Sequence, residues 1–281
     1  MLFRSAEVFF EPLTPLAIQE ILKQAASKLG VELDREVPEN ISEYTIEGRK
    51  AISILADAYG LACYRDDAGE SCRITLEDVL EVVQVSRLSP YVTCKVSSQR
   101  EVGKIFGLGV MGFLGSVLEI EAVAFPARTQ GQGAIRFNDT AGSMAKDSVF
   151  NAASVIRKLT GEDMANYDLH VNVVGGGRID GPSAGVAIFL AILSAIQGRP
   201  IPQNLAVTGE VSIQGKVRAV GGICEKIYGA RQAGIKAILL PDENQKDVPA
   251  DLKGIQVVAV STVEEIIRHV FPPTGVNDLV S

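Results

Sequence analysis

The sequence GPSAGVAIFLAILSAIQG, at residues 181–198, is apolar nearly all round once its glycine-flanked start has passed. A helix with apolar side chains on every side is buried, so this segment predicts the centre of a core. Outward from it, expected strands alternate with expected helices. The strands are expected at residues 115–125, 167–174, 204–222 (turns at Gly209 and Gly215) and 236–241, and the helices at 143–161, 223–234 and 262–271. This alternation predicts a mixed α/β domain at residues 89–271, followed by a flexible tail at 272–281.

The first 88 residues have a different pattern, which indicates four helices. Their expected bounds are 14–30, 38–45, 48–60 and 75–84. The first helix has Thr14 as N-cap, Pro15 at its first position and Gly30 at its end. The fourth has Thr75 as N-cap with Asp78 three positions on, as in a capping box. The core-facing stripe expected on the third helix is Ile52, Leu55, Ala56 and Tyr59. These helices predict a small all-α bundle at residues 1–88, and hence a multidomain chain.

Composition and charge exclude several classes of function. The 281 residues are 47% hydrophobic and carry a net charge of −7, which argues against nucleic acid as a partner. The two histidines, His170 and His269, are too few for a histidine-rich metal site. No apolar stretch reaches about 18 residues, so a cytoplasmic protein without membrane contact is expected. Cys63 and Cys72 could pair, although the cysteines are more typical of small core residues.

Three glycine-rich segments resemble phosphate-binding loops but lack the required context. GLGVMG at Gly107, Gly109 and Gly112 matches GxGxxG, yet a strand is expected after it instead of a helix. GEVSIQGKV lacks the P-loop spacing and has Val217 in place of the metal-binding hydroxyl. GGGRID at residues 175–180 could cradle an anion, although a loop beside an active site suits it better. We therefore expect no cofactor and no ATPase activity in this chain.

Ser183, at the start of the apolar helix, permits two interpretations. A serine in this position is commonly a cap. Asp180 already suits the cap, however, and Pro182 suits the first turn, where N–H groups and the helix dipole favour a developing oxyanion. A nucleophilic serine needs a base, and because histidine is scarce, a buried neutral lysine is the alternative. Lys226 in GGICEK is the candidate, although a lone lysine in such a helix is usually a solvated residue.

DGPSAG and GGICEK place Ser183 and Lys226 43 positions apart, with TGEVSIQGKVRAVGG between them. These motifs resemble the proteolytic domain of the Lon family, and the likeness covers about residues 90–271. It extends to AGSMAKDSVFNAASVIRKL upstream and LLPDENQKD downstream. The resemblance implies a serine endopeptidase with a Ser–Lys dyad, in which Ser183 is the nucleophile and Lys226 the base.

The same resemblance implies supporting roles for three further residues. Thr208 matches the threonine that hydrogen-bonds the lysine. Asp180 matches an acid associated with gating of the active-site loop, and His170 falls near a histidine in the strand before that loop. The sequence departs from the common family pattern at Cys224, Asn172 and Asp147. These departures affect what the resemblance implies about the substrate pocket, and they leave the implied reaction class unchanged.

The helical region at residues 1–88 resembles the α-helical lid of an AAA+ ATPase, as found before the protease domain in Lon proteins. Arg49 would match the sensor arginine that reads the nucleotide in an intact parent protein. The resemblance implies a fragment of a longer protein, in which a missing ATPase core uses ATP and Mg to thread unfolded polypeptides into a homo-oligomeric ring, usually a hexamer.

A second hypothesis is a catalytically silent Lon-like oligomerisation scaffold. Such scaffolds usually lack the serine or the lysine. Both residues are present here, which favours the peptidase.

Overall fold

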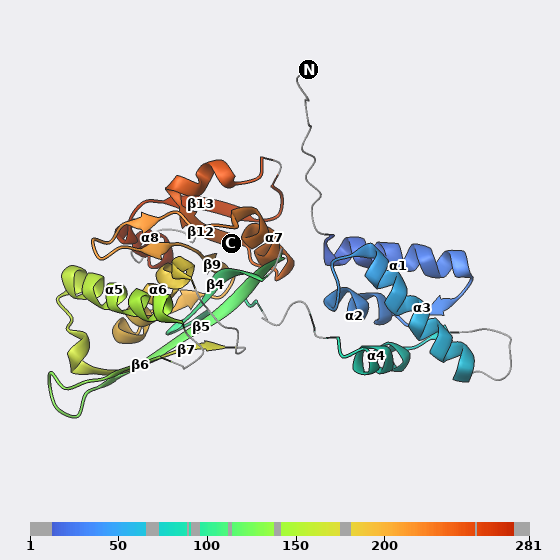
Figure 1. Cartoon of the computed structure of the whole chain (residues 1–281), viewed down its shortest axis with the longest axis horizontal. Helices are drawn as coiled ribbons and strands as arrows, with labels where there is room; N and C mark the ends of the chain where they lie inside the picture. Colours follow the sequence, from blue (N-terminus) through green and yellow to red (C-terminus); the bar gives the residue numbers. More distant parts are fainter. Residues whose placement is uncertain are drawn as a thin grey trace, which may run out of the picture. The chain divides into compact units, whose positions relative to one another are not determined.

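The computed structural model describes residues 13–65, 73–88, 90, 96–111, 114–137, 142–174, 181–250 and 252–272. The chain divides into two compact units, Met1–Thr93 and Cys94–Ser281 (Figure 1). Separate hydrophobic clusters form the cores of the two units. The division lies close to residue 88, where the sequence pattern changes. None of the helices in the described residues is long and apolar enough to cross a bilayer.

Four helices form most of the N-terminal unit. They are α1 (Pro15–Leu29), α2 (Val37–Glu43), α3 (Gly48–Arg65) and α4 (Leu76–Val85), and a short parallel pair joins β1 (Glu32–Leu33) to β2 (Arg73–Ile74). The Thr14 hydroxyl accepts a hydrogen bond from Ala17 N, and Gly30 ends α1 in a left-handed conformation. Thr75 and Asp78 form the expected capping box at the start of α4. The four helices are therefore confirmed, whereas β1 and β2 are additions to the prediction.

The buried face of α3 differs from the stripe expected from the sequence. Ile52 is 46% exposed and Ala56 is also exposed, so this part of the prediction is wrong. The buried residues are Ala51, Ile54, Leu55, Ala58 and Ala62. The helix carries two overlapping apolar stripes, and the pattern alone cannot choose between them. Packing against α1 and α4 selects the stripe that includes Ile54 and Ala58.

A seven-stranded mixed sheet forms the centre of the C-terminal unit, in the order β13-β12-β9-β4-β5-β7-β6. The strands from β13 to β4 are parallel, β5 is antiparallel to both β4 and β7, and β6 is parallel to β7. Their bounds are β4 (Lys104–Met111), β5 (Leu114–Pro126), β6 (Ile135–Phe137), β7 (Tyr167–Val174), β9 (Leu205–Val207), β12 (Ala237–Pro241) and β13 (Gln256–Val260). This topology confirms the predicted mixed α/β domain.

Helices cover both faces of this sheet. They are α5 (Ser143–Thr160), α6 (Gly185–Gln197), α7 (Ile223–Gln232) and α8 (Val263–Val270). Ile105 belongs to a core shared with α5, α6 and α8, whereas its neighbour Phe106 belongs to a core formed with α7. Successive residues of a strand point to opposite faces, so α7 lies on one face and the other three helices on the other (Figure 1). Every residue of α6 from Gly185 to Ser194 is buried, as its apolar sequence predicts.

Short elements complete this unit. They are the antiparallel pair β3 (Arg100–Glu101) and β8 (Ile201–Pro202), the antiparallel pair β10 (Glu210–Val211) and β11 (Val217–Arg218), and the 3-10 turns η1 (Met164–Asn166), η2 (Pro182–Ala184) and η3 (Asp242–Asp247). Gly107 and Gly109 of GLGVMG lie in β4, which pairs with β5, and Gly112 lies outside the described residues. The strand expected after this segment is therefore confirmed as β5. Residues 175–180 and Cys72 also lie outside the described residues.

Candidate active site

Ser183 lies in the 3-10 turn η2, which leads directly into α6. Pro182 occupies the first position of this turn, as expected, because its fixed φ suits a helix start. The N-cap is Gly181, which offers no side-chain hydrogen bond, instead of the expected Asp180, which lies outside the described residues. Ser183 is therefore not the cap, and it is partly exposed at the N-terminal end of a buried helix.

Backbone hydrogen bonds hold η2, which carries Ser183 and is called the serine turn below, against the turn that follows β9. Gly209 N donates to the carbonyl oxygen of Ser183 at 3.0 Å, and Val186 N donates to the carbonyl oxygen of Gly209 at 3.0 Å. Gly209 has a φ of 149°, and a Cβ there would lie 2.9 Å from a methyl carbon of Val217. Only glycine suits this backbone and this space. The position of Ser183 is thus fixed on both sides of η2.

Thr208 follows the last residue of β9 and is 1% exposed. Its backbone N–H donates to the carbonyl oxygen of Leu239 in β12 at 3.0 Å. Its hydroxyl donates to the carbonyl oxygen of Ser183 at 3.4 Å and accepts a hydrogen bond from Lys226 Nζ at 3.2 Å. Hydrogen bonds therefore join the serine turn, Thr208 and Lys226. Direct contact between the Ser183 hydroxyl and Lys226 stays a prediction.

Lys226 lies in the first turn of α7 and is 3% exposed, so it is not a solvated helix residue. Burial lowers the pKa of its amine from 10.5 to about 8, and the neighbouring negative charge of Glu225 offsets part of this effect. Burial destabilises the charged form of a lysine, whereas a nearby carboxylate stabilises it. The neutral amine is consequently well populated at mildly alkaline pH, where it can accept a proton.

The start of β5 packs directly against the backbone of α7. A Cβ built on Gly115 would overlap the carbonyl oxygen of Glu225, and a Cβ built on Gly229 would overlap the backbone of Gly115. Glycine inside a strand often marks such a close approach of two backbones. This contact fixes the turn of α7 that carries Lys226 against the sheet.

We expect Gly115→Ala to destabilise the C-terminal unit by about 2–4 kcal/mol, because α7 must move away from β5 to relieve the overlap. Gly221→Ala is the matched control, since a Cβ at Gly221 would meet open space and its φ is ordinary. Urea unfolding measures the stability of both variants, with hydrogen exchange of the α6 amides as the probe of the C-terminal unit. Equal stability of the two variants would contradict the close packing.

The candidate residue His170 takes no part in the hydrogen bonds of this cluster. His170 is exposed on β7, where Val123 and Arg136 flank it on neighbouring strands, and no hydrogen bond among the described residues links it to Ser183 or Lys226. Its role as a supporting residue stays a prediction.

Arg49 is exposed in the first turn of α3, in the N-terminal unit. The Cys224 thiol, two residues before Lys226, donates to the carbonyl oxygen of Asp247 at 3.3 Å. Burial and the nearby Glu225 raise the pKa of this thiol, so it stays protonated at neutral pH. Among the described residues, no group of three or more His, Cys, Asp or Glu side chains could hold a metal ion.

Sequence reasoning missed two residues that position the site. Gly115 had a recognisable signal, because it is a glycine within a predicted strand. Leu239 had none, because it contributes a backbone carbonyl that any residue could supply.

Comparison with known proteins agrees with these observations. Residues 74–273 match the family model of the Lon protease (S16) C-terminal proteolytic domain, a match that begins inside the N-terminal compact unit. Lon protease 2 of Bacillus subtilis is 36% identical over 96% of this chain and 51% of its own length. The archaeal Lon protease of Archaeoglobus fulgidus is 35% identical over 70% of this chain and 32% of its own length. The chain thus spans about half of the former relative and a third of the latter. From the site geometry, the matched domain and these relatives together, the chain belongs to the Lon protease family.

Proposed function

We propose that this chain is a serine endopeptidase in which Ser183 is the nucleophile and Lys226 the general base. The observation that carries the proposal is the buried amine of Lys226, whose pKa is lowered to about 8 and which reaches the serine turn through Thr208. A buried lysine of this kind serves a hydroxyl nucleophile where histidine is absent. The presence of both residues disfavours a silent scaffold.

The proposed reaction is an acyl transfer through an ester of Ser183. The Ser183 hydroxyl oxygen attacks the scissile carbonyl carbon while its proton passes to the neutral amine of Lys226. The resulting oxyanion lies at the N-terminal end of α6, where backbone N–H groups and the helix dipole favour negative charge. Collapse breaks the C–N bond, and the protonated Lys226 returns its proton to the leaving amine. Water then hydrolyses the acyl ester, with Lys226 again as base.

A peptidase assay over pH tests this proposal. Because Lys226 must be neutral and its pKa is about 8, we expect kcat/KM for a fluorogenic peptide to rise about tenfold from pH 7 to pH 9. Below pH 7 the amine is protonated and the rate falls further. Activity that peaks below pH 7, or no activity at any pH, would contradict the assignment of the base.

The wider role rests on the relatives and on the N-terminal unit. We propose that this unit corresponds to the α-helical lid of an AAA+ ATPase, with Arg49 as its nucleotide sensor in an intact parent protein. In that parent, ATP and Mg would drive unfolded polypeptides into a hexameric chamber for protein quality control in the cytoplasm. The 281-residue chain alone should cleave short peptides, and added ATP should not change the rate.

A further inference from the structure

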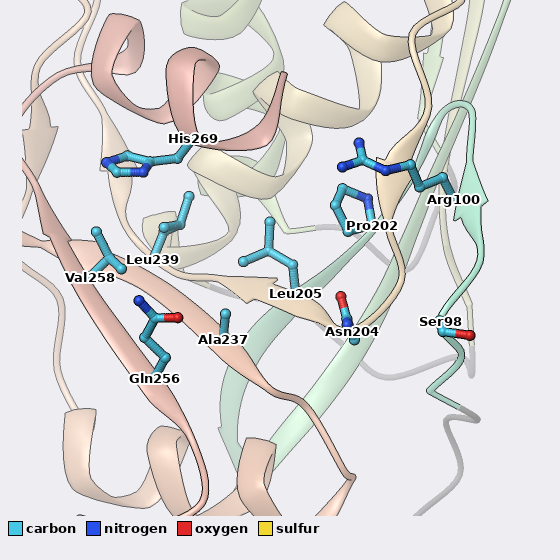
Figure 2. Close-up of a pocket in the computed structure, with 10 residues that line it drawn as sticks. All are labelled: Ser98, Arg100, Pro202, Asn204, Leu205, Ala237, Leu239, Gln256, Val258 and His269. Carbon is cyan, nitrogen blue, oxygen red and sulfur yellow. The ribbon is translucent and has the colours of Figure 1, made fainter. Parts of the chain in front are cut away.

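A cavity of about 90 Å³ lies at the end of β9 opposite to Thr208. Its floor comes from the first halves of three parallel strands, β9, β12 and β13, and its walls from α8, β8 and the segment around β3 (Figure 2). The lining residues are Ser98, Arg100, Pro202, Asn204, Leu205, Ala237, Leu239, Gln256, Val258 and His269. Apart from the backbone carbonyl of Leu239, none of them contributes to the proposed catalytic site, so this cavity is a second candidate site.

The floor of the cavity is aliphatic. Leu205, Leu239 and Val258 point toward its centre, and Ala237 leaves room between them (Figure 2). Aliphatic surface of this kind favours a short hydrocarbon group over water. The floor therefore suits a side chain of the size of valine or leucine.

The polar part of the lining offers several hydrogen-bond donors and contains no carboxylate among the described residues. Arg100 and His269 lie on opposite sides of the cavity in Figure 2, with the amides of Asn204 and Gln256 below them. The side chains of Asn204, Gln256 and His269 make no hydrogen bond to another residue in the described part of the chain. They are consequently available to a ligand or to water.

The charge of the lining contrasts with that of the whole chain. The sequence has 34 acidic and 27 basic residues, yet the ten described lining residues include an arginine and no acid. A guanidinium binds a carboxylate by charge-assisted hydrogen bonds, and the amides can bind further polar atoms. We propose that this cavity binds a small ligand that combines a carboxylate with a short aliphatic group, the chemistry found at the C-terminal residue of a peptide.

The cavity is also connected to the catalytic cluster, which is formed by Ser183, Thr208 and Lys226, through one lining residue and its hydrogen bond. Leu239 lines the cavity with its side chain, and its carbonyl oxygen accepts the hydrogen bond from Thr208 N at 3.0 Å. Thr208 in turn accepts the hydrogen bond from Lys226. A ligand that displaces Leu239 therefore changes the environment of the Thr208 amide.

N-acetyl-L-valine is the probe, with N-acetyl-L-valinamide as its neutral counterpart. We measure binding by calorimetry on the full chain carrying Ser183→Ala, so the result does not depend on the proposed peptidase activity. A dissociation constant on the order of 1 mM is expected for the acid, and binding of the amide should be about tenfold weaker. Arg100→Gln should weaken binding of the acid about tenfold, whereas Arg128→Gln, which removes an exposed arginine outside the lining, should leave it unchanged.

An NMR titration locates the site in the same samples. The Thr208 amide signal should shift as the acid is added, while amides of α1 in the N-terminal unit should not. Equal binding of the acid and the amide, unchanged binding after Arg100→Gln, or an absence of saturable binding up to about 10 mM would each overturn the proposed site. Saturable binding without a shift of the Thr208 amide would overturn its connection to the catalytic cluster.

Discussion

Lys226→Met is expected to abolish peptidase activity and, at the same time, to make the C-terminal unit more stable. Methionine has a similar length and no charge, so it fills the space of Lys226 without the cost of burying an ammonium group. A pKa lowered from 10.5 to about 8 corresponds to about 3 kcal/mol against the folded state at pH 7. Loss of the hydrogen bond to Thr208 removes about 1 kcal/mol. The net gain expected at pH 7 is therefore about 2 kcal/mol.

The pH dependence of this gain has a definite sign. Below pH 8 the folded protein holds a charged, buried Lys226, and the methionine variant has its full advantage. Between pH 8 and 10.5 the folded lysine is neutral while the unfolded one still binds a proton, so the stability of the unsubstituted protein rises with pH. Above about pH 10.5 the pKa contribution disappears, and the hydrogen bond to Thr208 should leave the unsubstituted protein more stable by about 1 kcal/mol.

Urea unfolding at pH 7 and pH 9.5 measures this difference, with hydrogen exchange of the α6 amides as the probe because the two units can unfold separately. Lys236→Met is the control, since Lys236 is exposed and should change stability little. A Lys226→Met variant that retained peptidase activity would exclude this residue as the base. A variant that was less stable at pH 7 would show that the amine is not buried as a charged group.

Ser183→Ala is expected to lower kcat for peptide hydrolysis at least a thousandfold, because no other group replaces the attacking oxygen. Stability should change by less than about 0.5 kcal/mol, since the hydrogen bonds that fix the turn use the carbonyl oxygen of Ser183, which alanine retains. Loss of activity with an intact fold is the signature of a nucleophile.

Ser154→Ala provides the matched control for this experiment. Ser154 lies on α5, where its hydroxyl donates to the carbonyl oxygen of Phe150 and takes no part in the hydrogen bonds that join Ser183, Thr208 and Lys226. Peptidase activity should therefore be unchanged, and circular dichroism should show both variants folded. Equal residual activity in Ser183→Ala and the unsubstituted protein would reject the peptidase in favour of the scaffold.

Much of the fold follows from local sequence pattern. The uniformly apolar segment after Gly185 predicts a buried helix, and Thr14, Gly30 and Thr75 mark helix ends correctly because capping depends on neighbouring residues alone. Strand order does not follow in this way. Phe106 and Ala206 pair in parallel β4 and β9 although about 100 positions separate them, and no local signal encodes that pairing.

In the candidate site, too, the features that depend on local sequence were predictable and those that depend on tertiary packing were not. Its helix start was predictable from Pro182 and the glycines around Ser183, which are local features. The burial of Lys226 was not, because the sequence of α7 alone fits a solvated lysine. Burial depends on the backbone contact between Gly115 and Gly229, which joins β5 to α7. Tertiary packing therefore decides the property on which the proposed chemistry depends.

The hydrogen bonds of Thr208 have a consequence for the direction in which Lys226 can react. A threonine hydroxyl has one hydrogen, and here it is donated to the carbonyl oxygen of Ser183. Lys226 must therefore give an N–H to this oxygen whether or not the amine is protonated. In the neutral amine, the nitrogen lone pair then points away from Thr208, which leaves it available for the hydrogen of an incoming hydroxyl.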